Sequence, residues 1–139
     1  MNVGRWMQKH VITVRPRDSI VHARRVMEEH RVNQLPVVVD DRLVGIVTDR
    51  DLRDAFPSVF EVRRARRARG TDPASIVVED VMSANVLTLD PEADVREGAR
   101  LMRGERIGSV PVVQGKRLVG ILTRSDVLDA FLSLERGLV

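Results

Sequence analysis

The sequence predicts a mixed α/β protein (α+β) made of two copies of one β-α-β-β-α unit. Residues 3–56 align with residues 78–131 at a constant offset of 75, with 21 identities in 54 positions. Within each copy, short apolar runs typical of strands alternate with stretches whose apolar residues recur at helical spacing. A fixed period of this length indicates a duplicated supersecondary unit, and two equivalent copies predict two equivalent sites rather than one catalytic centre.

Composition is typical of a globular protein from a reducing compartment. The 139 residues are 43% hydrophobic and 31% charged and include no cysteine, which excludes thiol catalysis, disulfides and cysteine metal sites. No run approaches the roughly 20 apolar residues of a membrane span, and the first residues lack the apolar core of a signal peptide. We therefore expect a cytoplasmic protein that does not bind membranes. Each copy has little apolar area of its own, so we expect the two copies to share one core.

Each copy begins with a short strand and a helix. Residues 11–14 and 86–89 are β-branched or aliphatic runs, and a proline follows each run two residues later. Ser19 and Asp94 occupy equivalent positions as helix N-caps and precede apolar residues at helical spacing. We therefore expect a helix to start directly after each of these two residues.

A hairpin and a second helix complete each copy. Residues 35–39 and 43–47 are apolar runs around a polar turn, and the second copy repeats the pattern 75 residues later. Because both strands are nearly all apolar, we expect helices to cover both faces of the sheet. The second helices are expected to begin at Asp49 and Arg124.

An arginine-rich linker separates the copies, so we divide the chain into residues 1–56, 57–77 and 78–139. Apolar residues three apart predict that the linker is partly helical, with a wide basic face. The basic run consists of Arg63, Arg64, Arg66, Arg67 and Arg69. This run can be a solvated helix face, or a patch that binds the phosphates of a nucleotide or a nucleic acid.

Two motifs recur around the hairpin of both copies. Residues 36–38 and 43–51 read PVV and LVGIVTDRD, and their counterparts read PVV and LVGILTRSD. The doubled motif resembles the tandem cystathionine-β-synthase (CBS) domain pair, or Bateman module, over almost the whole chain. It is similar to the CBS portion of acetoin-utilisation-type regulatory proteins. The resemblance implies two repeats packed with pseudo-two-fold symmetry and adenosine-containing ligands bound in clefts between them.

The Thr-x-x-Asp step at the start of each second helix has two compatible interpretations. Thr48 with Asp51, and Thr123 with Asp126, have the spacing of a helix capping box. The same geometry suits a nucleotide, because a helix N-terminus attracts phosphate and a fixed carboxylate can accept both ribose hydroxyls. The resemblance implies that the two acids hold ribose and that the two threonines, with Ser125, contact phosphate or ribose.

The resemblance also implies where the nucleobase lies. The base would contact the first strand and the residues before each hairpin proline: His10, Ile12, Val32, Asn33 and Gln34 in the first copy, and Asn85, Leu87, Ile107, Gly108 and Ser109 in the second. For the four aliphatic members of this set, packing in the core explains the residue at least as well as ligand contact.

The two copies differ at the start of the second helix. The first copy has Asp49 and Arg50 where the second has Arg124 and Ser125. An additional carboxylate beside a phosphate weakens anion binding unless Arg50 offsets it. We therefore expect the second site to bind its ligand more tightly.

Other polar clusters have simpler explanations. His10, His22 and His30 are not spaced as metal ligands and are expected on the surface. Ser19 is explained as a helix cap and not as a nucleophile. The acidic pair in the first hairpin, residues 40–41, is explained as turn residues, although paired acids can also bind Mg²⁺.

These features predict a regulatory ligand-sensing module without enzymatic activity and with no required cofactor. The ligand would be AMP, ADP, ATP, S-adenosylmethionine or a dinucleotide. The sequence does not distinguish among these and an empty pocket, and it does not identify the regulated target. The resemblance further implies a homodimer formed through exposed helices. Candidate contacts are Met27, Met102, Phe56 and Phe131, although packing in the core of one chain explains each of them equally well.

Two other functions are compatible with parts of the chain. An adaptor for nucleic acid or a protein partner would bind through the run from Arg63 to Arg69, and the two repeats would serve only as the scaffold that presents it. A small enzyme would need an activated nucleophile or an acid–base pair, and the sequence offers only the capping acids.

Overall fold

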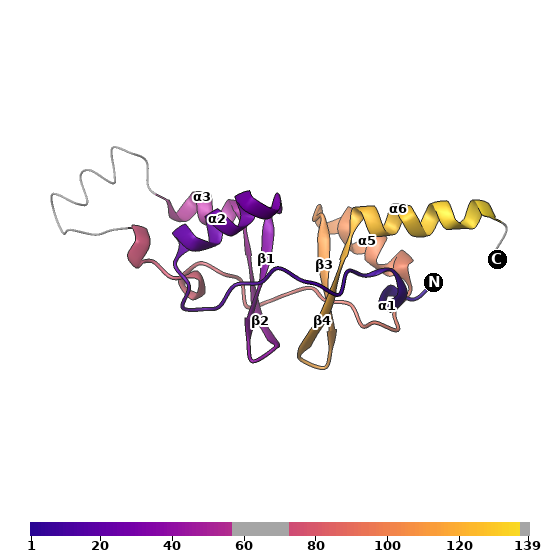
Figure 1. Cartoon of the computed structure of the whole chain (residues 1–139), viewed down its shortest axis with the longest axis horizontal. Helices are drawn as coiled ribbons and strands as arrows, with labels where there is room; N and C mark the ends of the chain where they lie inside the picture. Colours follow the sequence, from indigo (N-terminus) through magenta and orange to yellow (C-terminus); the bar gives the residue numbers. More distant parts are fainter. Residues whose placement is uncertain (57–72, 137–139) are drawn as a thin grey trace. The chain divides into compact units, whose positions relative to one another are not determined.

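A computed structural model describes residues 1–56 and 73–136 of the chain (Figure 1). The chain divides into two compact units. The first-repeat unit is Ile12–Val86, and the second-repeat unit combines Met1–Val11 with Leu87–Val139. Each unit therefore contains one copy's helices and hairpin, together with the short segment that begins the other copy.

The first-repeat unit is built on a hairpin and two helices. Its elements are α2 (Ile20–His30), β1 (Gln34–Val39), β2 (Arg42–Thr48) and α3 (Asp49–Ala55), followed by the 3-10 turns η1 (Pro73–Ser75) and η2 (Val78–Asp80). Ser19 is the N-cap of α2, and its hydroxyl accepts a hydrogen bond from the His22 amide at 3.0 Å. The helix ends where Arg31 adopts the left-handed conformation.

The second-repeat unit repeats this plan after an additional short helix. Its elements are α1 (Val3–Trp6), α5 (Val95–Glu105), β3 (Ser109–Gln114), β4 (Arg117–Thr123), α6 (Arg124–Ser133) and η3 (Leu134–Arg136). Asp94 is the N-cap of α5 and accepts the Arg96 amide at 2.9 Å. The Arg96 side chain also hydrogen-bonds this carboxylate, which holds the pKa of Asp94 well below its usual range.

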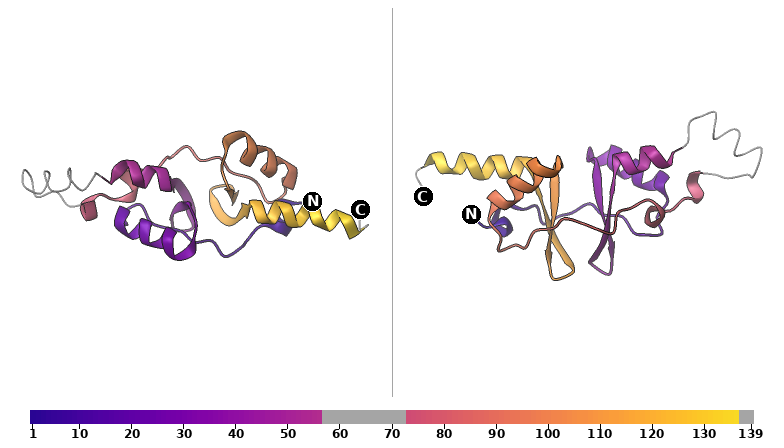
Figure 2. Two further views of the ribbon diagram at one scale, coloured as in Figure 1. Left: turned by 90° about the horizontal axis from the view of Figure 1, so that it is seen from above. Right: turned by 180° about the vertical axis from the view of Figure 1, so that it is seen from behind.

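Both hairpins form as predicted, with antiparallel pairing and two-residue turns. Asp40 and Asp41 turn the first hairpin with positive φ angles of 48° and 66°, and Gly115 has a φ of 61° in the second. The second helices start at the predicted residues, Asp49 and Arg124. In each unit the two helices pack against each other and against their own hairpin (Figure 2).

The predicted first strands are reduced to one paired residue each. Val14 forms a parallel bridge with Val37, and Leu89 forms the equivalent bridge with Val112. Val14 donates to the Pro36 carbonyl at 3.1 Å, but Pro36 has no N–H that could extend the parallel ladder back to residue 12. The prediction of regular strands over residues 11–14 and 86–89 is therefore wrong, because it did not consider which donors the neighbouring strand offers.

Each unit also has a buried cluster of its own, contrary to the expectation of one shared core. The first-repeat cluster includes Ile20, Leu35 and Val78, and the second-repeat cluster includes Leu122 and Val3. Each of these two valines comes from the start of the opposite copy: Val78 begins the second copy and Val3 begins the first. These segments add apolar area to units that would otherwise be too small to bury a core.

The same segments pair with the second strand of each hairpin. Gln8 exchanges two main-chain hydrogen bonds with Ile121, at 2.8 and 2.9 Å. In the first-repeat unit, Ser83 and Ile46 exchange the same pair of bonds, both at 2.9 Å. The beginning of the first copy thus pairs with β4, and the beginning of the second copy pairs with β2.

Two buried glycines make this close approach possible. A Cβ atom on Gly120 would lie 2.5 Å from the Met7 sulfur and 2.9 Å from the Gln8 carbonyl oxygen. Gly45 has the equivalent relation to Met82 and to the residue after it. Both glycines belong to the repeated LVGI motif, so part of that motif is explained by packing.

We predict that Gly120→Ala lowers the free energy of unfolding by about 1–3 kcal/mol, because the added methyl group overpacks the contact with the N-terminal segment. The matched control is Gly104→Ala on α5, where nothing lies within 4 Å of the new Cβ. The control should raise stability by up to about 1 kcal/mol through helix propensity. Urea denaturation of both variants measures the difference, and equal stabilities would contradict the packing role of Gly120.

Candidate functional site

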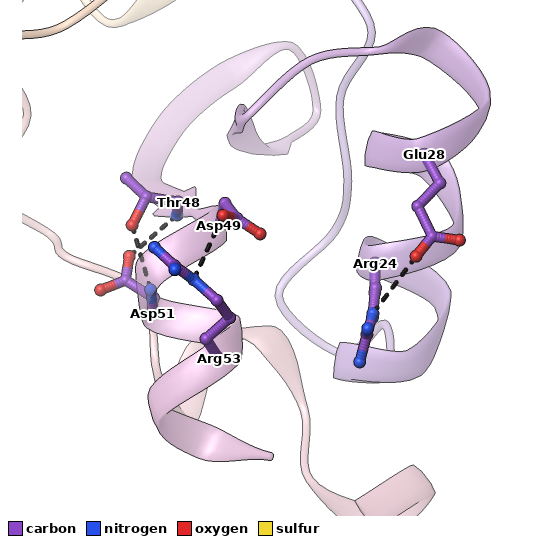
Figure 3. A network of polar contacts seen from close by, with 6 residues as sticks. All are labelled: Arg24, Glu28, Thr48, Asp49, Asp51 and Arg53. Atoms are coloured by element: carbon purple, nitrogen blue, oxygen red, sulfur yellow. Dashed lines mark hydrogen bonds and ion pairs between the residues drawn. The ribbon is translucent and has the colours of Figure 1, made fainter.

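The junction between β2 and α3 contains the first Thr-x-x-Asp step as a complete capping box. The Thr48 amide donates to Asp51 Oδ2 at 2.8 Å, and the Asp51 amide donates to Thr48 Oγ1 at 3.1 Å. Figure 3 shows these two residues at the first turn of α3. Thr48 is extended while the next residue is helical, so the box fixes both the direction of the helix and the position of the Asp51 carboxylate.

The junction between β4 and α6 repeats this arrangement with one additional bond. The Thr123 amide donates to Asp126 Oδ2 at 2.7 Å, and the Asp126 amide donates to Thr123 Oγ1 at 3.3 Å. The Thr123 hydroxyl also lies 2.9 Å from Asp126 Oδ2, to which it donates. The capping interpretation of the motif is thus realised in both copies.

Main-chain bonds connect each junction to residues of the predicted base pocket. The Asp49 amide donates to the Asn33 carbonyl at 2.7 Å, and the Arg124 amide donates to the Gly108 carbonyl at 3.2 Å. Each of these carbonyls belongs to the short turn between the preceding helix and the hairpin. The first amide of each second helix is therefore already bonded, and the predicted base-side residues 33 and 108 lie next to the Thr-x-x-Asp steps.

The two carboxylates differ in burial and in their partners. Asp126 is 3% exposed, whereas Asp51 is half-buried. Gln8 Nε2 donates to Asp126 Oδ1 at 2.7 Å, so both oxygens of this acid have partners. Among the described residues, Asp51 Oδ1 accepts no side-chain hydrogen bond. The sequence analysis did not identify Gln8 as a site residue. Gln8 aligns with Ser83, and nothing in this pair of residues indicates that either side chain contacts a junction carboxylate.

Charges around the first junction are neutralised locally. Arg53 Nε lies 3.2 Å from Asp49 Oδ2, and Arg24 Nε lies 3.3 Å from Glu28 Oε1 (Figure 3). The ion-pair partner of Asp49 is thus Arg53, one helical turn along α3, and not Arg50. Because these side chains are mostly exposed, each pair contributes little to stability.

The second junction has Arg124 at the position that Asp49 occupies in the first junction. A Cβ on Gly108 would lie 3.6 Å from Arg124 Cζ, so the guanidinium lies against the backbone of Gly108. Arg124 also lines an apolar groove of about 450 Å³ between α5 and α6, together with Met102 and Leu128. The described residues form no ion pair with Arg124, which leaves its charge available beside the junction.

The predicted site residues are divided between the two units. The first-repeat unit holds Ile12, Val32, Asn33, Gln34, Thr48, Arg50, Asp51 and Asn85, and the second-repeat unit holds His10, Leu87, Ile107, Gly108, Ser109, Thr123, Ser125 and Asp126. His10 and Asn85 thus lie in the unit opposite to the helix junction of their own sequence copy. Their assignment to a site stays a prediction.

Burial separates the four aliphatic candidates into two pairs. Ile12 and Ile107 pack against the buried clusters of their units, which supports the core explanation for both. Val32 and Leu87 are 38% and 44% exposed. Core packing does not explain these two residues, so they remain candidates for contact with an apolar base.

The remaining candidates are the histidines, the acidic turn of the first hairpin and the basic linker run. The described parts of the chain contain no group of three metal-ligating side chains, and the three histidines are exposed as expected. Asp40 and Asp41 form the tight turn of the first hairpin.

No helix within residues 1–56 and 73–136 is long and apolar enough to cross a bilayer. The basic run from Arg63 to Arg69 lies outside the described residues, so its helical character stays a prediction.

The hairpin, the two helices and the capped junction define a small repeat module, and comparison with known families identifies it. The family model of the CBS domain matches residues 3–58 and 78–133. The chain therefore belongs to the CBS domain family, as two tandem repeats. The predicted resemblance and the predicted fold class are confirmed by this match.

Relatives of known sequence include proteins that are several times longer than this chain. Inosine-5′-monophosphate dehydrogenase of Korarchaeum cryptofilum is 37% identical over 120 residues, which are 86% of this chain and 22% of that protein. An uncharacterized protein of Methanocaldococcus jannaschii is 34% identical over 97% of this chain and 33% of its own length. The chain thus spans between about a fifth and a third of these relatives.

Three solved structures share the fold over nearly their full length. CBSX2 of Arabidopsis thaliana in complex with AMP is 30% identical, with a TM-score of 0.77 and coverage of 96% of this chain and 98% of that one. The CBS domain pair of protein MJ0100, in complex with 5′-methylthioadenosine and S-adenosyl-L-methionine, is 29% identical, with a TM-score of 0.72 and coverage of 96% and 98%. A protein described as the acetoin utilization protein AcuB of Vibrio cholerae is 27% identical, with a TM-score of 0.75 and coverage of 98% and 93%.

We predict that Thr48→Ala lowers the free energy of unfolding by about 0.5–2 kcal/mol, through loss of the helix cap. Thr123→Ala should cost more, because it also removes a hydroxyl donor from the buried Asp126 carboxylate. Urea denaturation without ligand measures both, and Thr→Ser at each position should restore most of the loss. A smaller cost at Thr123 than at Thr48 would contradict the role assigned to this hydroxyl.

Proposed function

We propose that this chain is a regulatory module that binds an adenosine-containing ligand at its two Thr-x-x-Asp junctions and has no catalytic activity of its own. The observation that carries the proposal is the pair of equivalent junctions, each holding a carboxylate at a fixed position beside a helix start. Membership of the CBS family supports it, since relatives of similar length are solved with AMP and with S-adenosyl-L-methionine.

Each junction offers the chemistry that a nucleoside needs. A carboxylate accepts hydrogen bonds only, so it pairs with ribose hydroxyls, which can donate. Thr48 and Thr123, with Ser125, would contact the phosphate or the ribose, where the positive end of the helix favours an anion. Asp51 and Asp126 would hold the ribose, and the remaining residues of the predicted set would contact the base.

The proposed role is regulatory because the junction acids already serve the fold. Both carboxylates are bound by the amides of their own capping threonines, which favours positioning over proton transfer. A ligand at such a site acts by stabilising one arrangement of the molecule over another, by no more than its differential affinity for the two. We place this module in the cytoplasm, where adenosine compounds are available and a chain without cysteine needs no disulfide.

We predict that AMP or S-adenosyl-L-methionine at 100 times its dissociation constant raises the free energy of unfolding by about 2.7 kcal/mol for each site that it occupies. Thermal unfolding measures this shift across AMP, ADP, ATP and S-adenosyl-L-methionine. Asp51→Asn and Asp126→Asn should each reduce the stabilisation, and the double variant should abolish it. Asp54→Asn, an exposed acid on α3 outside the proposed site, is the matched control and should leave the shift unchanged. Unchanged melting temperatures with all four compounds at millimolar concentration would refute the proposal.

We further propose a homodimer formed through the exposed face of α6. Leu128, Phe131 and Leu132 are 60%, 63% and 53% exposed, and their spacing places them on one face of the helix. Of the four predicted contacts, Met27 and Met102 are buried in the clusters of their own units. Phe56 is half-buried with Arg24 over its ring at 5.2 Å, so Phe131 is the predicted contact that remains exposed.

We predict that Leu128→Arg combined with Phe131→Ser converts the dimer to a monomer, because it places a charge and a polar group on the apolar face. Size-exclusion chromatography with light scattering measures the mass of the wild type and the variant. Val39→Ser, which changes a 45% exposed valine at the end of β1, is the control and should leave the mass unchanged. A monomeric wild type, or a dimeric double variant, would rule out this interface.

A further inference from the structure

The contact between Gln8 and Asp126 joins the N-terminal segment to a proposed ribose site. Gln8 Nε2 lies 2.7 Å from Asp126 Oδ1. Because a carboxylate accepts hydrogen bonds only, the amide presents its NH₂ group here and behaves as a ribose hydroxyl would. The donor is neutral and the acceptor is charged and buried, which makes the bond stronger than one between two neutral groups.

The number of lone pairs decides whether ribose and Gln8 can bind together. A carboxylate has about four acceptor positions. Asp126 already receives three donors: the Thr123 amide, the Thr123 hydroxyl and the Gln8 amide. One position remains, whereas two ribose hydroxyls need two. Asp51 receives only the Thr48 amide from the described residues, so it retains enough acceptor positions for both hydroxyls.

The first-repeat unit has no counterpart of this contact. Ser83 is the residue equivalent to Gln8, and its main chain pairs with β2 in the same way. The Ser83 hydroxyl accepts the Asn85 amide at 3.3 Å and lies 3.4 Å from the Asn85 carbonyl. Its short side chain is thus engaged within its own turn and makes no hydrogen bond to Asp51 among the described residues.

The position of the Gln8 backbone does not depend on its side-chain bond to Asp126. Two hydrogen bonds with Ile121 and the close approach at Gly120 fix its backbone against β4. Gln8 is itself exposed to solvent, although the acid that it contacts is buried. Its side chain can therefore swing away from Asp126 and be solvated without unpacking the segment.

We propose that Gln8 is an internal competitor for ribose at Asp126, so that the two proposed sites load in sequence and the Asp51 site loads first. This inference rests on the proposed function. A ligand at the second junction must break the bond between Gln8 and Asp126 before both hydroxyls can bind, which lowers its apparent affinity there. The charges of Asp49 and Arg124 alone predict the opposite order, in which the second site binds its ligand more tightly and loads first.

The experiment isolates the second site and then removes the competitor. AMP and S-adenosyl-L-methionine are titrated by calorimetry into Asp51→Asn and into the double variants Asp51→Asn with Gln8→Ala and Asp51→Asn with Gln8→Met. The methionine keeps the length of the side chain but has no donor. We expect both Gln8 variants to bind about tenfold more tightly than Asp51→Asn alone. A purely structural role for Gln8 would weaken binding, so a gain in affinity distinguishes competition from damage.

Asp51→Asn with Ser83→Ala is the matched control, and its affinity should equal that of Asp51→Asn. If ligand binds but the Gln8 variants bind equally or more weakly, the competition is refuted and the proposed function stands. If neither compound binds the wild type or any variant, the proposed function fails and this inference fails with it.

Discussion

The hydrogen bonds between Thr and Asp at the end of each hairpin are the interaction on which the rest of the molecule depends. Thr48 and Thr123 end a strand in extended conformation, and the acid three residues later binds the threonine amide. This contact sets the direction in which α3 and α6 leave the hairpin. It also immobilises a carboxylate at low entropic cost, since the same bonds that start the helix position the acid. The fold and the proposed ligand binding thus use one set of atoms.

The second constraint is the exchange of short segments between the copies. Each hairpin pairs with residues from the beginning of the other copy, and a buried glycine allows the two backbones to approach. The exchange adds Val3 and Val78 to the two buried clusters. It also explains why two nearly identical junctions are chemically different. The segment that reaches the second junction carries a glutamine, whereas the one that reaches the first carries a serine.

Most of the fold could be predicted because it depends on local chemistry repeated twice. The caps at Ser19 and Asp94, both hairpin turns and the starts of α3 and α6 follow from residues within a few positions of each feature. The predictions failed where a distant partner decides the outcome. Residues 11–14 have strand composition, but Pro36 offers no donor to most of them. Val32 is as apolar as any core residue, yet it lies exposed beside a junction.

The sequence alone determined the class of protein, the positions of both Thr-x-x-Asp steps and the identity of the candidate acids, because each of these is written in a contiguous motif. The tertiary structure decided which segment lies against which hairpin, how deeply each acid is buried and which side chain shares its oxygens. Those properties depend on contacts between residues far apart in the sequence, such as Gln8 and Asp126, which are 118 positions apart. No local periodicity or spacing carries that information, so the difference between the two junctions emerged only from the folded chain.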